Sequence, residues 1–193
     1  MAVVFVIFFV LNALYHWYKK DKNISPDSKA IEYRLFDSTF SIRSPFIIPP
    51  DSSTSNTNNL NIEKITASSY TSENIVLSFM SAKFKPYVSI DTGYVKSVNS
   101  YLKRSDSLFA FRSVITKKDS MLIDGKKAMK FSGERKSERQ DEFKDYLPRN
   151  FDLLVIKNPP YVYMVYFEDD LRNDDIEQVK RKLYSSIKIT EEK

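Results

Sequence analysis

The sequence predicts an α+β fold, in which an antiparallel β-sheet of about six to seven strands carries helices on its faces and follows an apolar N-terminal helix. Aromatic residues make up 14% of the chain, with 12 Tyr and 14 Phe, and such side chains favour strands. Short turn sequences separate several pairs of apolar runs, which is typical of antiparallel hairpins. Two predicted strands are apolar on both sides, so each face of the sheet needs a covering layer of helices or chain termini.

The N-terminal segment is the most apolar part of the chain. Residues 2–14 carry no charge, and residues 15–18 are His16 and three aromatic residues that favour the headgroup level of a membrane. Because about 20 apolar residues span a bilayer, the run has a marginal length. We predict a membrane anchor or an uncleaved signal segment over residues 1–18, and hence a single-pass membrane protein. A cleaved signal peptide and a buried core helix are the alternatives.

A polar tether over residues 19–30 then leads to one globular domain over residues 31–193, a length that suits a single core. Three lysines follow the apolar segment and are expected to contact anionic lipid: Lys19, Lys20 and Lys22. The positive-inside rule would leave the domain in the cytoplasm, whereas the short signal-like run and the polar spacer suit an exported domain. On balance we predict an extracytoplasmic domain.

The composition excludes several kinds of chemistry. The chain has no Cys, so it has no disulfide, thiolate nucleophile or thiolate metal site. Its one His, His16, lies in the N-terminal segment, so the domain has no histidine triad or zinc motif. Only three Gly residues leave no phosphate-binding glycine loop. The net charge of +5 comes from scattered basic residues, so we expect no nucleic-acid partner. Because the motifs named above are missing, we also expect no cofactor and no catalytic or metal-binding residue.

The first part of the domain predicts one strand and then a hairpin. The strand lies within residues 31–45, where apolar and polar residues alternate and prolines follow. Residues 51–59 predict a polar, low-complexity loop. Residues 61–70 and 75–84 predict two strands joined by a short turn. The second of these strands is apolar on both faces, so we expect it at the centre of the sheet.

The middle of the domain predicts a helix and a second group of strands. Residues 91–105 place their apolar side chains on one helical stripe after a cap at Asp91 or Thr92. Residues 109–116 return to a strand pattern. Within residues 121–133, the pair Asp124-Gly125 predicts a tight turn between short strands, since glycine adopts a positive φ without a steric clash.

The last part predicts another hairpin and a closing helix. Residues 134–145 alternate in charge and predict a solvated loop or a small surface helix. Residues 151–157 and 161–168 predict a hairpin around Asn158-Pro159-Pro160, again apolar on both faces. Asp174 or Asp175 caps the closing helix. Its apolar face consists of Ile176, Val179, Leu183 and Ile187.

Three short motifs resemble the superfamily of photosystem II extrinsic subunit P (PsbP) and the Mog proteins. Thr39–Pro45 is similar to its opening strand, Ile123–Ala128 to its mid-domain turn, and Ile176–Ile187 to its closing helix. Pro49-Pro50 departs from the pattern, since the family often has a glycine-tryptophan pair there. The resemblance implies an αβα sandwich with a binding or assembly role rather than catalysis. It transfers no active site, because these motifs hold turns and core.

Several acidic residues are candidate metal ligands or catalysts. Glu168, Asp169 and Asp170, together with the two caps of the closing helix, could surround a hard cation such as Ca²⁺, although acids at a helix N-terminus also interact favourably with its dipole. A carboxylate-based hydrolase needs two acids across a cleft. The available acids are Glu73, Glu134, Glu138 and Asp141, and no sequence feature brings them together.

Aromatic residues of the last hairpin could form a partner-binding surface or belong to the core. These are Tyr161, Tyr163, Tyr166 and Phe167. The sequence therefore predicts a membrane-tethered, non-catalytic binding or assembly domain that docks a protein partner. The alternative is a membrane-anchored hydrolase or metal-dependent enzyme that uses carboxylates.

Overall fold

The computed structural model describes residues 29–49, 53–56, 61–72, 74–86, 102, 106, 111–137, 148–170 and 176–190.

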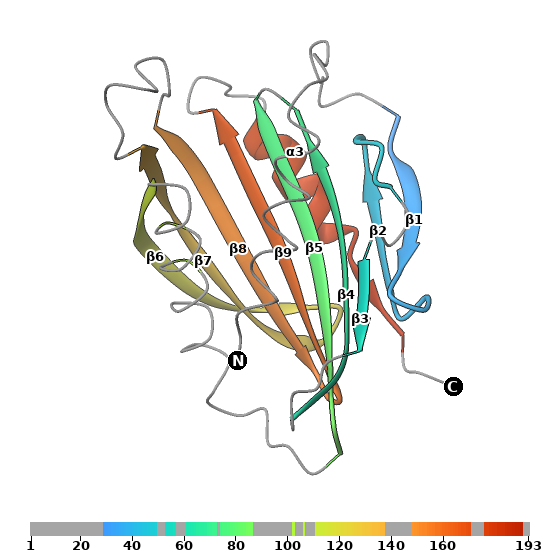
Figure 1. Ribbon diagram of the computed structural model, residues 1–193. Coiled ribbons are helices and arrows are strands. Elements are labelled where there is room, and N and C mark those ends of the chain that lie inside the picture. The colour runs from blue at the N-terminus through green and yellow to red at the C-terminus, as the bar shows by residue number, and fades with distance from the viewer. Residues whose placement is uncertain are drawn as a thin grey trace.

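A seven-stranded antiparallel sheet forms the body of the domain, in the order β3-β4-β5-β9-β8-β7-β6 (Figure 1). Its strands are β3 (Ser53–Asn56), β4 (Ile62–Thr71), β5 (Ile75–Phe84), β6 (Phe111–Ile123), β7 (Lys126–Ser137), β8 (Arg149–Asn158) and β9 (Tyr161–Asp170). Strands β5 and β9, both apolar on two faces, are neighbours near the middle of the sheet, as the pattern predicts. Strand β6 lies at one edge.

The three predicted tight hairpins are confirmed, and they join β4 to β5, β6 to β7 and β8 to β9. In the β6–β7 turn, Asp124 and Gly125 have φ angles of 50° and 75°. Two consecutive left-handed residues define a type I′ turn, whose twist matches that of paired strands. The local turn chemistry therefore sets the register of this hairpin.

A second, three-stranded sheet has the order β1-β2-β10. Its strands are β1 (Ile31–Leu35), β2 (Phe40–Ser44) and β10 (Lys188–Ile189). Helix α3 (Ile176–Ser185) packs beside this sheet, and together they cover one face of the large sheet (Figure 1). The apolar stripe predicted for the closing helix is confirmed, because Ile176, Val179 and Leu183 are buried in that core.

Each face of the large sheet has its own apolar cluster, because successive side chains of a strand point to opposite sides. The face toward α3 includes Phe40, Phe79 and Tyr163. The opposite face includes Phe131, Phe151 and the buried Leu102. Leu102 has a helical backbone and falls within the predicted helix 91–105, most of which lies outside the described residues.

The predicted fold class is wrong in its helices. The described chain is mostly strand in two antiparallel sheets, and α3 is the one helix whose course is described, so helices on both faces of an αβα sandwich are not found. Residues 31–45 form two strands instead of one, because Phe36, Asp37 and Ser38 have positive φ and reverse the chain. The predicted loop 51–59 contains β3, and the predicted loop 134–145 begins as the end of β7. The predicted N-terminal helix lies outside the described residues.

The predicted location in a membrane also needs correction. Among the described residues, no helix is long and apolar enough to cross a bilayer. The anchor over residues 1–18, on which that prediction depended, lies outside the described residues, as do Lys19, Lys20 and Lys22. The predicted single-pass membrane location is therefore not supported by the part of the chain that the structure describes.

Gly133 is the position in β7 where a side chain would meet the neighbouring strands. A Cβ there would lie 2.1 Å from the carbonyl oxygen of Val114 and 2.9 Å from the ring of Phe151. We expect Gly133→Ala to lower the free energy of unfolding by about 1–3 kcal/mol, because β6 must shift. Urea denaturation measures this. Gly125→Ala is the comparison, because a Cβ at Gly125 would meet no other atom within 4 Å. We expect this variant to lower the free energy of unfolding by about 1–2 kcal/mol, since only the φ of 75° is unfavourable for alanine. Unchanged β6 amide protection in Gly133→Ala would contradict the predicted shift.

Candidate functional site

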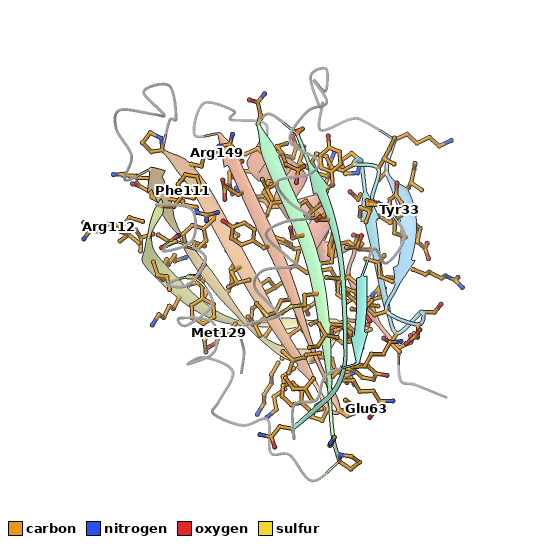
Figure 2. All side chains as sticks on the ribbon, in the orientation of Figure 1. Tyr33, Glu63, Phe111, Arg112, Met129 and Arg149 are labelled. Carbon is orange, nitrogen blue, oxygen red and sulfur yellow. The ribbon has the colours of Figure 1, made fainter. Side chains whose placement is uncertain are left out.

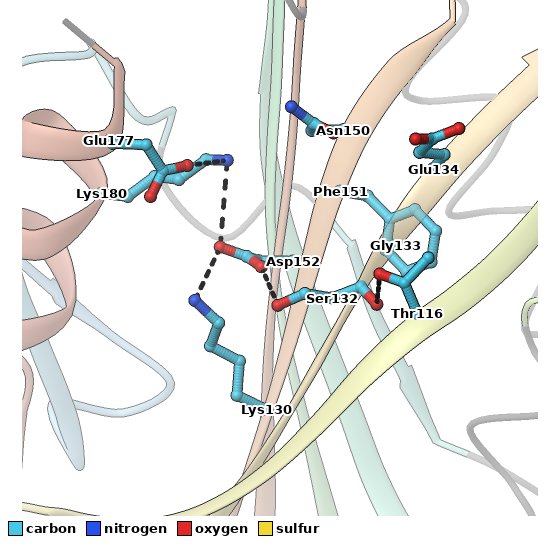
Figure 3. A pocket seen from close by; sticks show the side chains of 10 residues that line it. All are labelled: Thr116, Lys130, Ser132, Gly133, Glu134, Asn150, Phe151, Asp152, Glu177 and Lys180. Atoms are coloured by element: carbon cyan, nitrogen blue, oxygen red, sulfur yellow. Dashed lines mark hydrogen bonds and ion pairs between the residues drawn. The ribbon is translucent and has the colours of Figure 1, made fainter. Parts of the chain in front are cut away.

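A polar cavity of about 300 Å³ lies between the start of α3 and strands β6, β7 and β8 (Figure 3). Its charged lining consists of Lys130, Glu134, Asp152, Glu177 and Lys180. The same cavity is lined by Thr116, Ser132, Gly133, Asn150 and Phe151. Because two lysines and three acids meet here, the cavity is the candidate site for chemistry or for a ligand.

Asp152 lies at the centre of this cluster, on the face of β8 that points toward α3 (Figure 3). Ser132 Oγ donates a hydrogen bond of 2.5 Å to Asp152, and Lys130 Nζ lies 3.1 Å from it. Tyr184 donates a third contact of 3.4 Å, and Lys180 Nζ lies 3.9 Å away. Burial and the Asp152 carboxylate together raise the pKa of Tyr184 well above its ordinary value. Three donors within 3.4 Å of one buried carboxylate, with a fourth positive group at 3.9 Å, use most of its acceptor sites.

Lys180 carries the buried positive charge of the cluster, with a side chain only 3% exposed. It forms an ion pair with Asp169 and lies 3.1 Å from Glu177 Oε1. Burial alone would lower the pKa of Lys180, but Asp169, Asp152 and Glu177 outweigh burial and raise it. The amine therefore stays protonated near neutral pH, whereas a nucleophilic lysine needs a lowered pKa.

Asp169 is the acid most affected by burial. Burial raises its pKa to about 6, and the opposing attraction of Lys180 only reduces this shift. Both partners of the pair therefore have raised pKa values, because burial dominates for the carboxyl and three carboxylates dominate for the amine.

A second ion cluster lies on the opposite face of the sheet, around Glu168. Arg135 Nη1 lies 3.1 Å from Glu168 and Arg149 Nη1 lies 3.6 Å away, while Tyr166 donates a hydrogen bond of 2.6 Å. Burial would raise the pKa of Glu168, but the two guanidinium groups outweigh burial and lower it. Figure 2 shows Phe111, whose ring lies under Arg135, at the same end of the sheet as Arg149.

The acids predicted around the last helix do not converge. Glu168 and Asp169 are neighbours in β9, so they point to opposite faces and enter separate clusters. The side chain of Asp170 and both predicted caps, Asp174 and Asp175, lie outside the described residues. Within the ranges that the structure describes, no group of three or more His, Cys, Asp or Glu side chains is placed to hold a metal ion.

Among the candidate acids for hydrolysis, Glu134 is described, and its carboxylate lies on the cavity wall, 3.1 Å from Lys136 Nζ. The remaining three, Glu73, Glu138 and Asp141, lie outside the described residues. The aromatic residues of the last hairpin belong to the core and form no surface patch, because Tyr161, Tyr163, Tyr166 and Phe167 are all buried.

Sequence reasoning missed the Lys180 cluster, although two signals marked it. Lys180 falls on the apolar stripe of α3, four residues after Ile176 and three before Leu183. Asp152 interrupts the otherwise apolar interior of β8. A charge within an apolar stripe indicates a buried, paired group, but the partners are distant in sequence.

The raised pKa of Asp169 predicts a pH dependence of stability. The unfolded carboxyl titrates near about 3.9, and the folded one near about 6. Between these values the folded state binds the proton more tightly, so this contribution to the free energy of unfolding falls as the pH rises. Relative to the wild type, Asp169→Asn should therefore gain stability from about pH 4 to about pH 6, as measured by urea denaturation.

Asp124→Asn is the matched control with the opposite sign. The amide of Ile189 donates a 2.8 Å hydrogen bond to Asp124, which lowers the pKa of that carboxyl. Its contribution is therefore present above the unfolded pKa and is lost as the pH falls through the folded pKa. Relative to the wild type, this variant should lose stability as the pH rises toward about 4. Parallel curves for Asp169→Asn and the wild type would contradict the prediction.

The sheet order, the closing helix and the paired small sheet define the class of fold, which is PsbP-like. The structure is similar to the solution structure of cyanobacterial PsbP (CyanoP) from Synechocystis sp. PCC 6803, with a TM-score of 0.58 and 9% identity over 90% of this chain and 99% of that chain. The predicted resemblance is therefore confirmed at the level of the fold.

Other comparisons add no further identification. A crystal structure of PA94 from Pseudomonas aeruginosa, described as a protein of unknown function and putative regulator, is similar with a TM-score of 0.37 and 13% identity over 79% of this chain and 89% of that chain. At that score we base no argument on it. No protein-family model matches the sequence. No curated protein sequence matches it either.

Proposed function

We propose that this chain is a non-catalytic binding or assembly domain that docks a protein partner. One observation carries the proposal: among the described residues, three of the five exposed large apolar side chains belong to the edge strand β6. Val114 is 47% exposed, Met121 37% and Leu122 69%. Single exposed apolar residues are ordinary, whereas a group of them along an edge strand, where another chain can pair, favours a protein contact.

The state of the cavity acids supports a role without catalysis. A general base must be free to accept a proton from a substrate within hydrogen-bond reach. Asp152 already has three donors within 3.4 Å and the Lys180 amine at 3.9 Å, and Asp169 is buried against Lys180. The PsbP-like fold is compatible with a binding or assembly role.

A carboxylate-dependent hydrolase is the second candidate, and one observation favours it. Glu134, Asp152 and Glu177 line one cavity, and Asp169 beside it has a pKa of about 6. Perturbed acids in a cavity are typical of catalytic sites as well as of structural ion pairs. The two candidates differ in what Asp152→Asn does, because only a hydrolase would lose turnover.

The test is quantitative affinity capture from native cells, using the full chain as bait, followed by rebinding of the purified captured protein. The β6 variant combines Val114→Ser, Met121→Ser and Leu122→Ser. The control variant combines Ile31→Ser and Ile47→Ser, which are the other two exposed large apolar side chains among the described residues. We expect the wild type and the control to bind one protein equally and the β6 variant to bind it about tenfold more weakly.

Two results would overturn this proposal. One is equal capture of every protein by the β6 variant and the wild type, provided that both unfold at the same urea concentration. The other is turnover of a hydrolase substrate that the wild type shows and Asp152→Asn loses.

A further inference from the structure

We propose that the outer edge of β6, between its bulge and its turn, binds an extended acidic segment of a partner protein by strand addition. The inference rests on the proposed function and names the place, the backbone geometry and the chemistry of the partner. In strand addition, main-chain hydrogen bonds supply much of the affinity and alternate side chains supply specificity.

The edge is long and open. Strand β6 has 13 residues and is the last strand in the order of the sheet, so no described strand pairs with its outer side. Between the bulge and the turn, the exposed residues of β6 are Lys117, Lys118, Ser120, Met121 and Leu122. An exposed edge of this kind presents unpaired N–H and C=O groups to another chain.

The hairpin register shows which backbone groups face outward. The type I′ turn closes on the pair Ile123 and Lys126. Residues opposite each other in an antiparallel ladder alternate between hydrogen-bonded and non-hydrogen-bonded pairs. Counting back from the closing pair, which is hydrogen-bonded, Lys118, Ser120 and Leu122 occupy the positions whose N–H and C=O groups point away from β7.

One part of the same edge already binds a carboxylate. Asp106 accepts a hydrogen bond of 2.6 Å from the Ser113 N–H and another of 2.8 Å from its Oγ. The bulge between Ile115 and Lys117 separates this occupied part from the open part. This edge of the sheet therefore already donates hydrogen bonds to one carboxylate. The stretch from Lys117 to Leu122, beyond the bulge, is where a second chain could pair.

The charge around the edge favours an acidic occupant. Exposed cations lie on β6 and on its neighbour β7, and Figure 2 shows Arg112 projecting outward from the sheet. They are Arg112, Lys117 and Lys118 on β6, and Lys127 and Lys136 on β7. The acid within this half of β6 is Asp119, which lies 2.8 Å from Lys117. Opposite charges on adjacent strands stabilise their pairing. A segment rich in Glu or Asp therefore complements this edge.

The side-chain pattern narrows the choice of segment. Lys118 pairs with Phe131 in the register, and Leu122 pairs with Lys127, so Lys118, Leu122 and Lys127 share the face opposite α3. An added strand would place acids on this face, beside Lys118, and apolar side chains on the other face, beside Met121, whose partner in the register is the core residue Ala128. We therefore infer an alternating acidic and apolar segment.

A second copy of this chain fits the edge less well. Two β6 strands paired about a two-fold axis at Lys118 would place the Lys118 side chains of the two copies opposite each other. Like charges on paired strands are destabilising. Self-association through β6 would appear as a dimer in light scattering.

The test uses the full chain and a capped ten-residue synthetic peptide in which glutamate alternates with valine. Isothermal titration gives the affinity, and amide hydrogen exchange by NMR gives the hydrogen bonds. We expect binding that weakens as salt is added and that protects the amides of Lys118, Ser120 and Leu122. A peptide with lysine in place of glutamate, and one with alternate prolines, should not bind.

Two variants separate strand addition from loose charge attraction. Ser120→Pro removes one outward N–H and no bond to β7, so it should fold and should weaken peptide binding about tenfold. Lys118→Glu should weaken binding about fivefold or more, whereas Arg181→Glu on the exposed side of α3 should not change it. If Ser120→Pro does not fold, Lys118→Glu and the exchange pattern of the wild type still decide the question.

Three outcomes would overturn the inference: no binding of the acidic peptide, binding without protection of the three amides, or a dimer by light scattering that Lys118→Glu stabilises. The proposed function fails on different evidence. If the wild type captures a protein partner and Ser120→Pro captures it equally, strand addition is wrong and the docking function stands. If the peptide binds but no protein is captured, the docking function fails.

Discussion

Replacing Lys180 by methionine is expected to lower the free energy of unfolding by about 3–5 kcal/mol, because the change leaves buried carboxylates without their cation. Lys180 pairs with Asp169 and lies 3.9 Å from Asp152, and both acids are buried. Methionine keeps most of the aliphatic volume, so the loss reports on charge more than on packing. Urea denaturation at pH 7 measures the effect.

The pH dependence of that loss identifies its cause. Without Lys180, Asp169 can avoid a buried charge only by binding a proton, which becomes more costly as the pH rises above its pKa. The penalty of Lys180→Met should therefore be smaller at pH 5 than at pH 7. Adding Asp169→Leu should recover part of the stability, since the uncompensated charge is removed.

Arg181→Met is the matched control, because this neighbouring residue of α3 is exposed. Its effect should stay within about 0.5 kcal/mol. A loss for Lys180→Met that equals the loss for Arg181→Met would mean that the buried pair contributes no net stability.

Phe40→Ala should also lower the free energy of unfolding by about 3–5 kcal/mol, because a fully buried ring is deleted where the two sheets meet. Phe40 lies on β2, and its ring centroid is 5.3 Å from that of Tyr163 and 6.2 Å from that of Phe79. These contacts link the small sheet to the large one. Thermal and urea unfolding, followed by circular dichroism, give the change.

Two further variants show whether the loss comes from the cavity. Phe40→Leu should cost less than Phe40→Ala, since it leaves a smaller void. Ile31→Ala on β1 should have little effect, because Ile31 is 51% exposed. Equal losses for Phe40→Ala and Ile31→Ala would contradict the role of Phe40 as the link between the sheets.

The candidate site was predictable only in part. A lysine on the apolar stripe of α3 and an aspartate within β8 both marked buried charge. Neither signal identified the partner, because Lys180, Asp152 and Asp169 meet only after β8, β9 and α3 have packed. In the same way, Glu168 and Asp169 are adjacent in sequence and belong to different faces.

The sequence by itself determined the hairpins, the central strands and the apolar face of the closing helix. Each depends on local features: a turn pair such as Asp124-Gly125, an alternating or two-faced apolar run, or a helical stripe. These preferences act between residues a few positions apart, so they can be inferred from the sequence.

Only the tertiary structure decided the second sheet, the open edge and the ion clusters. Strand β2 pairs with β10 from the other end of the chain, with Phe40 opposite Ile189. The exposure of β6 depends on its place at the end of the sheet order. Pairing of distant segments is set by the sum of burial and main-chain hydrogen bonding over the whole fold, which local sequence preferences do not contain.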